Sequence, residues 1–247
     1  MNDLLATALA AHGGLDRWNE LGSVSANLSI GGVLWDLKGL PGLFAISTYE
    51  ANLRSQSAVL GHFGSADRQV RFTPQRLVLK GLGGNLLAAR DAPRDAFAGH
   101  VNETPWDELH AAYFTGYALW TYLTQPFLYT YPGFEVEEIE PWAEQGETWR
   151  RLKVRFPDSI ASHTRDQISY FGPDGLLRRH DYAVDVLGGA TGAHYVDDYR
   201  TCDGIRAPFR RRVFPLGADN QRVPEPVLIS IDISVLRFAP AAANQNP

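Results

Sequence analysis

The stretch that decides the fold is residues 104–126, TPWDELHAAYFTGYALWTYLTQP. Thr104 can cap the first free amides of a helix, Pro105 suits the first helical position, and Pro126 ends the helix. Between these signals the side chains are apolar or aromatic almost all the way round, which is typical of a helix enclosed by protein. The segment therefore predicts a buried central helix.

One face of this helix is aromatic but carries polar tips. Spacings of three and four residues place six side chains on that face: Trp106, His110, Tyr113, Tyr117, Trp120 and Thr124. Such a face either packs in the core or lines a pocket in which a few polar groups orient a ligand. On the pocket interpretation, His110 is a candidate catalytic residue, and the candidate ligand-binding residues of the helix are Trp106, Tyr113, Tyr117 and Trp120.

Short segments with strand patterns flank the helix on both sides. Before it they cover residues 24–30, 33–37, 43–49, 57–60, 69–72, 76–79 and 86–89, and after it 136–141, 149–156, 167–171, 176–186, 193–202, 209–214 and 227–238. Gly, Pro, Asn and Asp turns separate them, and this regular short spacing favours an antiparallel meander. With a first helix at residues 2–11, the predicted fold class is mainly β (α+β), as a single domain over residues 1–247.

Strand alternation adds further candidates after the helix. In residues 176–184 it places Arg178, His180 and Tyr182 on one face, which we turn inward because its ends are apolar. His180 and Tyr182 are then candidate catalytic residues, and Arg178 is a candidate ligand-binding residue near the cavity rim. A histidine can transfer protons and a tyrosine or arginine can hold an oxyanion. The alternative is that these side chains only hydrogen-bond in a packed core.

Three other strands carry polar patterns. His194 shares an alternating face with Asp198 and Arg200, and we interpret this face as solvated. The alternative is that the face forms a polar pocket wall, in which case His194 is a candidate ligand-binding residue. Residues 149–156 place Trp149 on a face that is otherwise charged and mostly wet. The basic cluster at Arg206 and residues 210–212 divides between two faces, which favours a counter-ion or edge-strand role over nucleic-acid binding.

Composition and motifs narrow the functional classes. The net charge of −5 gives no reason to expect nucleic acid. The single cysteine, Cys202, is expected to be a small buried residue, and the seven histidines form no HExxH or i,i+4 helical pair, so no metal is expected. Nucleophile elbows, Walker loops and dinucleotide loops are missing, so we expect no cofactor. Without a recognisable signal or a membrane-length apolar run, the predicted location is cytoplasmic, with no membrane insertion.

The order of elements is also that of a known family. A first helix, a block of strands, an inserted helix and a second block of strands resemble the LolA/LolB-like lipoprotein-carrier fold over nearly the whole chain. Local similarities are HGGLDRW at residues 12–18 and YFGPDGLLRRHDY at 170–182, where Pro173, Asp174 and Gly175 make a hairpin turn. The resemblance implies a strongly curved antiparallel sheet, an unclosed barrel, that wraps around helices and leaves a hydrophobic cavity for acyl chains.

The resemblance leaves function open. The carriers are exported, whereas no signal is recognised in this chain, and its central helix is richer in Trp and Tyr, which suits a flat or aromatic ligand. The violacein-pathway enzyme VioE uses the same fold without a cofactor. Our first hypothesis is therefore a soluble protein that binds a hydrophobic or aromatic small molecule. The alternatives are a cofactor-independent acid-base enzyme (lyase, isomerase or cyclase type) acting on an aromatic or polyketide-like metabolite, and a structural module with a filled core.

Overall fold

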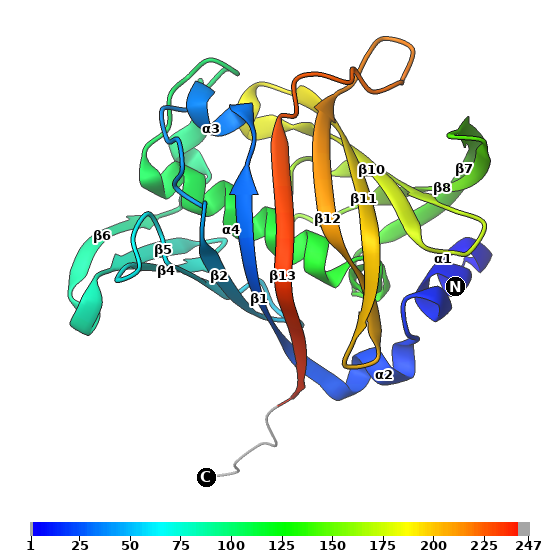
Figure 1. Ribbon diagram of the computed structural model, residues 1–247, viewed down its shortest axis with the longest axis horizontal. Coiled ribbons are helices and arrows are strands. Elements are labelled where there is room, and N and C mark those ends of the chain that lie inside the picture. Colours follow the sequence, from blue (N-terminus) through cyan, green and yellow to red (C-terminus); the bar gives the residue numbers. More distant parts are fainter. Residues whose placement is uncertain (1, 242–247) are drawn as a thin grey trace.

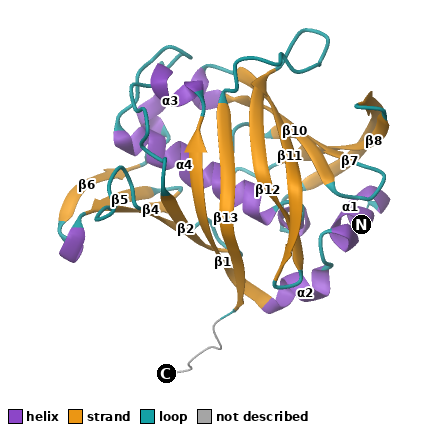
Figure 2. Ribbon diagram, in the orientation of Figure 1, coloured by secondary structure: helices purple, strands orange, loops and turns teal. Residues whose placement is uncertain are grey.

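A 13-stranded antiparallel sheet dominates the computed structural model, which describes residues 2–241 (Figures 1 and 2). Neighbouring strands follow the order β6-β5-β4-β3-β2-β1-β13-β12-β11-β10-β9-β8-β7, so each half of the chain forms one meander and β1 joins β13 in the centre. The sheet is open, with β6 and β7 as its edges. This arrangement confirms the predicted fold class.

The helices and strands have the following bounds. The α-helices of the described part are α1 Asp3–Ala11, α2 Leu15–Glu20, α3 Val33–Leu37 and α4 Glu108–Thr124. The strands are β1 Leu21–Gly31, β2 Ser47–Asn52, β3 Ala58–Gly61, β4 Gln69–Thr73, β5 Arg76–Lys80, β6 Leu86–Asp91, β7 Glu135–Glu144, β8 Glu147–Arg155, β9 Asp166–Phe171, β10 Leu177–Val184, β11 Ala190–Cys202, β12 Ile205–Pro215 and β13 Ile229–Pro240. None of the helices in residues 2–241 is both long and apolar enough to cross a bilayer.

The central helix α4 lies against one face of the sheet, and in Figure 1 it passes behind β2, β1, β13 and β12. Its residues from Ala111 to Thr124 are all buried, as the apolar pattern predicts. The helix approaches the sheet closely at Gly116, where a Cβ would lie 2.5 Å from the Phe72 ring. The Tyr49 hydroxyl donates to the Gly116 carbonyl at 2.9 Å. The core therefore forms between α4 and the inner face of the sheet.

The start of α4 differs from the prediction. The helix begins at Glu108 with Asp107 as its cap, and the prediction that Thr104 caps it and Pro105 opens it is wrong. The amide of Trp106 instead donates to the carbonyl of Lys38 at 3.1 Å. The Thr104 hydroxyl accepts from the amide of Val101, which closes a local turn. Tertiary contacts thus hold residues 104–106 outside the helix.

Residues 33–37 form the short helix α3, so the strand predicted there is wrong. Gly32 has a φ of +105°, and a Cβ at this position would lie 2.4 Å from the carbonyl oxygen of Leu228. The amides of Val33 and Leu34 then donate to the carbonyls of Val227 and Leu228, both at 3.1 Å. The chain therefore turns out of the sheet after β1 and crosses over the segment that leads into β13.

The solvated-face interpretation of His194 is also wrong, because its side chain is fully buried on the inner face. The register of β11 and β12 is the same on both sides of Asp198, with Asp197 opposite Arg210 and Tyr199 opposite Pro208, but Asp198 itself has a φ of +54°. This left-handed backbone conformation lies outside the extended region and interrupts the regular strand geometry at Asp198. Tyr199, the next residue, packs against the main core beside His12, and its hydroxyl donates to the carbonyl of Leu177 at 2.8 Å.

The basic cluster lies on β12, an inner strand between β11 and β13, so the edge-strand role is wrong. Arg210 pairs with Asp197, and Arg212 pairs with Asp232 at 2.8 Å, in the predicted counter-ion role. Arg211 points the other way and is buried on the inner face. Alternation thus separates three consecutive arginines into two different environments.

The outer face of the sheet is not uniformly wet. Trp149, predicted to lie on a mostly wet face, is 1% exposed. It belongs to a second, smaller hydrophobic cluster on that face, together with Tyr170, Ala193, Tyr195 and Phe214. Both faces of the second half of the sheet therefore carry buried side chains.

Candidate functional site

A cluster of buried histidines and tyrosines lies between the second half of α4 and strands β9 to β12. Its centre is Tyr122, whose hydroxyl lies 2.7 Å from Nε2 of His163 and 2.8 Å from the Tyr182 hydroxyl. Nδ1 of His163 lies 3.1 Å from the Tyr117 hydroxyl. His163 also stacks on Tyr182, with ring centroids 4.1 Å apart. These contacts form a continuous hydrogen-bonded chain from Tyr117 to Tyr182.

Further polar and aromatic side chains lie next to this hydrogen-bonded chain near the end of α4. Nε2 of Gln125 donates to the Tyr129 hydroxyl at 2.7 Å and lies 3.2 Å from Nδ1 of His180. The Tyr129 hydroxyl in turn lies 2.7 Å from Oγ of Ser169. The ring of His194 packs edge-on against Tyr122 at 4.4 Å between centroids. We call the set Tyr117, Tyr122, Gln125, His163, His180, Tyr182 and His194 the histidine cluster.

The three imidazoles of the cluster are neutral. Burial lowers the pKa of His180 to about 3, with the nearby charge of Arg211 as a second cause. Burial also lowers the pKa of His163 and His194 well below the ordinary value. In the tyrosines burial acts in the opposite direction and raises the pKa of Tyr182 well above its ordinary value. Burial thus disfavours the charged form of every one of these groups.

An apolar pocket of about 80 Å³ adjoins the cluster beneath α3. Its lining comes from α3, α4, the loops beside them and strands β10 to β13: Val33, Leu34, Leu37, Asn102, Phe114, Tyr182, Val184, Leu187, Ala190, Thr191, Gly192, Val213, Leu228 and Ile229. Val33 and Leu37 are 41% and 44% exposed, so they mark the mouth of this α3 pocket. Tyr182 belongs to both the α3 pocket and the histidine cluster, which are therefore contiguous.

The structure brings four of the predicted site residues together: Tyr117, His180, Tyr182 and His194. The other predicted residues lie elsewhere. His110 accepts from the amide of Asp107 at 3.2 Å and so helps to cap α4. Trp120 donates to the carbonyl of Asn52 at 2.8 Å. Arg178 pairs with Asp174 at 2.9 Å.

The remaining two are Trp106 and Tyr113. Trp106 packs against Phe97 and lies under the ammonium of Lys38, which is 4.9 Å from the indole centroid. Tyr113 lines an open polar groove that also includes Arg94 and Arg165. Neither residue contributes to the lining of the α3 pocket.

Sequence reasoning missed Tyr122, Gln125, His163 and Arg211. Tyr122 lies off the predicted aromatic stripe, and His163 belongs to a loop between β8 and β9, where no periodicity assigns a direction. The different position of Arg211 could have been found from the sequence, because strand alternation places it on the opposite face from Arg210 and Arg212. No three His, Cys, Asp or Glu side chains in residues 2–241 are arranged so that they could hold a metal ion.

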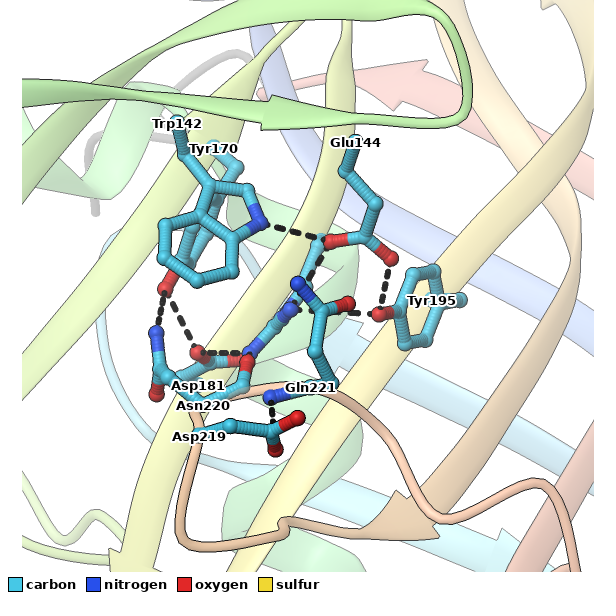
Figure 3. A network of polar contacts seen from close by, with 9 residues as sticks. Trp142, Glu144, Tyr170, Asp181, Tyr195, Asp219, Asn220 and Gln221 are labelled. Carbon is cyan, nitrogen blue, oxygen red and sulfur yellow. Dashed lines mark hydrogen bonds and ion pairs between the residues drawn. The ribbon is translucent and has the colours of Figure 1, made fainter.

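A second polar network lies on the outer face around Arg179, which is fully buried (Figure 3). Nε and Nη2 of Arg179 donate to the two carboxylate oxygens of Asp181 at 2.6 and 2.7 Å. Nη1 donates to Glu144 at 2.9 Å and to the Tyr195 hydroxyl at 3.2 Å, and Nη2 also donates to the carbonyl of Asn220 at 2.7 Å. All five donors of the guanidinium are used, so this network holds the 216–228 loop to the sheet and leaves no donor for a ligand.

Comparison with known proteins supports the fold. No family model and no curated protein sequence matches the chain. Among solved structures it is similar to a LolA superfamily protein from Nitrosomonas europaea, with 7% identity, a TM-score of 0.51 and coverage of 96% of this chain and 93% of that one. It is also similar to a DUF1329 family protein from Desulfovibrio piger, with 13% identity, a TM-score of 0.50 and coverage of 95% and 91%. The protein therefore has the LolA/LolB-like fold that the sequence resembles.

Proposed function

We propose that the protein binds a hydrophobic small molecule in the α3 pocket. The observation that carries the proposal is the pocket itself, whose walls are almost entirely aliphatic or aromatic and whose mouth exposes Val33 and Leu37. Transfer of apolar surface from water into such a site contributes about 25 cal/mol per Å². Thr191 and Asn102 are the polar residues of the lining, besides the phenol of Tyr182, and supply the few orienting groups typical of ligand sites.

A ligand larger than about 80 Å³ requires α3 to move outward, and its attachments suit such a movement. Glycines with positive φ flank the helix, Gly32 at +105° and Gly39 at +76°. At its end, the ammonium of Lys38 donates to the carbonyls of Asn102 and Thr104. Since these are a few hydrogen bonds at the two ends of a five-residue helix, we propose that α3 acts as the lid of the pocket.

The arrangement favours binding over acid-base catalysis. His110 is used in capping α4, away from the α3 pocket. An imidazole whose pKa is about 3, as in His180, is a weak base at neutral pH. The raised pKa of the Tyr182 phenol makes it a correspondingly weak acid.

The proposal predicts that hydrophobic ligands stabilise the protein. In a thermal unfolding assay against a panel of single-chain lipids and aromatic compounds, we expect some members to raise the melting temperature. A ligand at one hundred times its dissociation constant adds about 2.7 kcal/mol to the free energy of unfolding. An unchanged melting temperature across the panel would contradict the proposal.

A blocking variant with a matched control locates the site. Ala190 lines the α3 pocket, so Ala190→Leu places three more carbon atoms there and should abolish the thermal shift. Ala88 is also partly buried against the core but lies on β6, outside the pocket lining. Ala88→Leu should therefore keep the shift, whereas equal shifts in both variants would place the ligand elsewhere.

A further inference from the structure

Arg211 is a buried cation without a counter-ion. Its side chain is 2% exposed on the inner face, and Nη2 donates to the carbonyl of Tyr122 at 2.6 Å. Within the described residues, Nε and Nη1 have no hydrogen-bond partner, and no carboxylate forms an ion pair with this guanidinium. A charge in this position costs a large desolvation free energy unless it is paired.

Other buried cations of the chain are compensated. Arg179 has the carboxylates of Asp181 and Glu144, and the ammonium of Lys38 has two carbonyl oxygens. Arg211 has one carbonyl from the last turns of α4, where the helix dipole is negative, and the ring of Tyr122 at 5.3 Å. These contacts hold the guanidinium in place but leave two of its nitrogens free to bind an anion.

His194 adds a second donor next to Arg211. Both ring nitrogens of His194 are buried, and neither has a hydrogen-bond partner in residues 2–241. His194 pairs with Val213 across β11 and β12, and Val213 is two residues from Arg211 on the same face of the strand. Because the imidazole is neutral, it offers one N–H donor and no competing positive charge. Arg211 and His194 thus provide adjacent donors for an acceptor.

Neither donor belongs to the lining of the α3 pocket, but two residues of that lining lie next to them. Val213 lines the pocket and is the direct strand partner of His194, and Tyr182 of the lining packs 6.2 Å from the His194 ring. At about 3.4 Å per residue, Arg211 lies about 7 Å further along β12 than Val213. A molecule with an apolar tail under α3 would therefore present its inner end to Arg211 and His194.

We propose that the ligand of the α3 pocket is an amphiphile whose carboxylate pairs with Arg211 and accepts a hydrogen bond from His194, while its aliphatic tail runs towards Val33 and Leu37. This inference rests on the proposed function and adds the chemical class of the head group. The guanidinium fork matches a carboxylate, and a charge-assisted pair of this kind is about twice as strong as a neutral hydrogen bond.

Octanoate and octanol test the inference, because they share a tail and differ in the head group. By isothermal titration calorimetry we expect the wild-type protein to bind octanoate at least about tenfold more tightly than octanol. In Arg211→Gln the preference should disappear through weaker octanoate binding, with octanol affinity unchanged. Arg211→Lys, which keeps the charge but loses the fork, should retain part of the preference.

The outcomes separate the two proposals. Equal wild-type affinities for octanoate and octanol would overturn the carboxylate assignment and leave the α3 pocket intact as a hydrophobic site. Failure of both probes to bind would overturn the proposed function as well. A preference that survives in Arg211→Gln would remove Arg211 from the site, and tighter binding of octyl phosphate than of octanoate would replace the carboxylate by a phosphate. The wild-type comparison needs no variant, so it stands even if the variants fail to fold.

Discussion

Between pH 7 and pH 5.5 the free energy of unfolding should fall by about 5 kcal/mol. Four buried histidines have pKa values lowered by burial: His12 to about 4, His180 to about 3, and His163 and His194 well below the ordinary value. A lowered histidine pKa means that the folded state binds fewer protons than the unfolded state below pH 6.5. The contribution of these histidines to the free energy of unfolding is therefore fully present above pH 6.5 and is lost as the pH falls.

The magnitude follows from the number of histidines. Each of these histidines stays neutral in the folded state but takes up a proton in the unfolded state. Each one therefore lowers the free energy of unfolding by about 1.2 kcal/mol over this pH interval, and four lower it by about 5 kcal/mol. Urea unfolding at a series of pH values measures the loss directly. His180→Gln should make the pH dependence shallower by one proton. A free energy of unfolding that is constant from pH 7 to 5.5 would show that these histidines are not buried and neutral.

Arg179→Met should destabilise the protein by about 3–5 kcal/mol, because it leaves two carboxylates without their cation. Asp181 is 6% exposed, and burial already raises its pKa even in the presence of Arg179. The Glu144 side chain, also buried, would lose its bond to Nη1. The loop at residues 216–228 would lose the bond from Arg179 to the Asn220 carbonyl, one of the contacts that hold it to the sheet (Figure 3).

A double-variant design separates this effect from simple loss of packing. Adding Asp181→Asn to Arg179→Met removes one uncompensated charge and should recover part of the lost stability. Arg212→Met is the matched surface control, since its partner Asp232 is half exposed, and it should cost at most about 1 kcal/mol. Equal costs for Arg179→Met and Arg212→Met in chemical denaturation would contradict the role of the network.

The fold was predictable because the strongest patterns in the sequence are local. The apolar surround of α4 and the turn-separated strands specify a meander around a helix, and this is what forms. The errors lie where tertiary hydrogen bonds override a local pattern. The Lys38 carbonyl takes the amide of Trp106 and delays the start of α4, and Gly32 with the carbonyl of Leu228 turns 33–37 into a helix.

The site was predictable only in part, for a related reason. His180 and Tyr182 follow regular alternation on β10 and face inward as predicted, but the positive φ of Asp198 interrupts the regular geometry of β11 just before Tyr199. His163 reaches the cluster from a loop, where sequence periodicity carries no direction. Arg210, Arg211 and Arg212 are the same residue type, so their identity does not show which one is buried. Only the pairing of β12 with its neighbours shows that Arg211 is enclosed.

The most direct test of ligand binding in the α3 pocket is methyl NMR of the isotopically labelled protein titrated with octanoate. We expect the resonances of Val184, Val213 and Ile229, which line the pocket, to shift first and to saturate together. Methyl groups of Val70 and Leu77, equally buried but on β4 and β5, should keep their positions. Shifts confined to Val70 and Leu77, or no shifts at saturating octanoate, would contradict a binding site beneath α3.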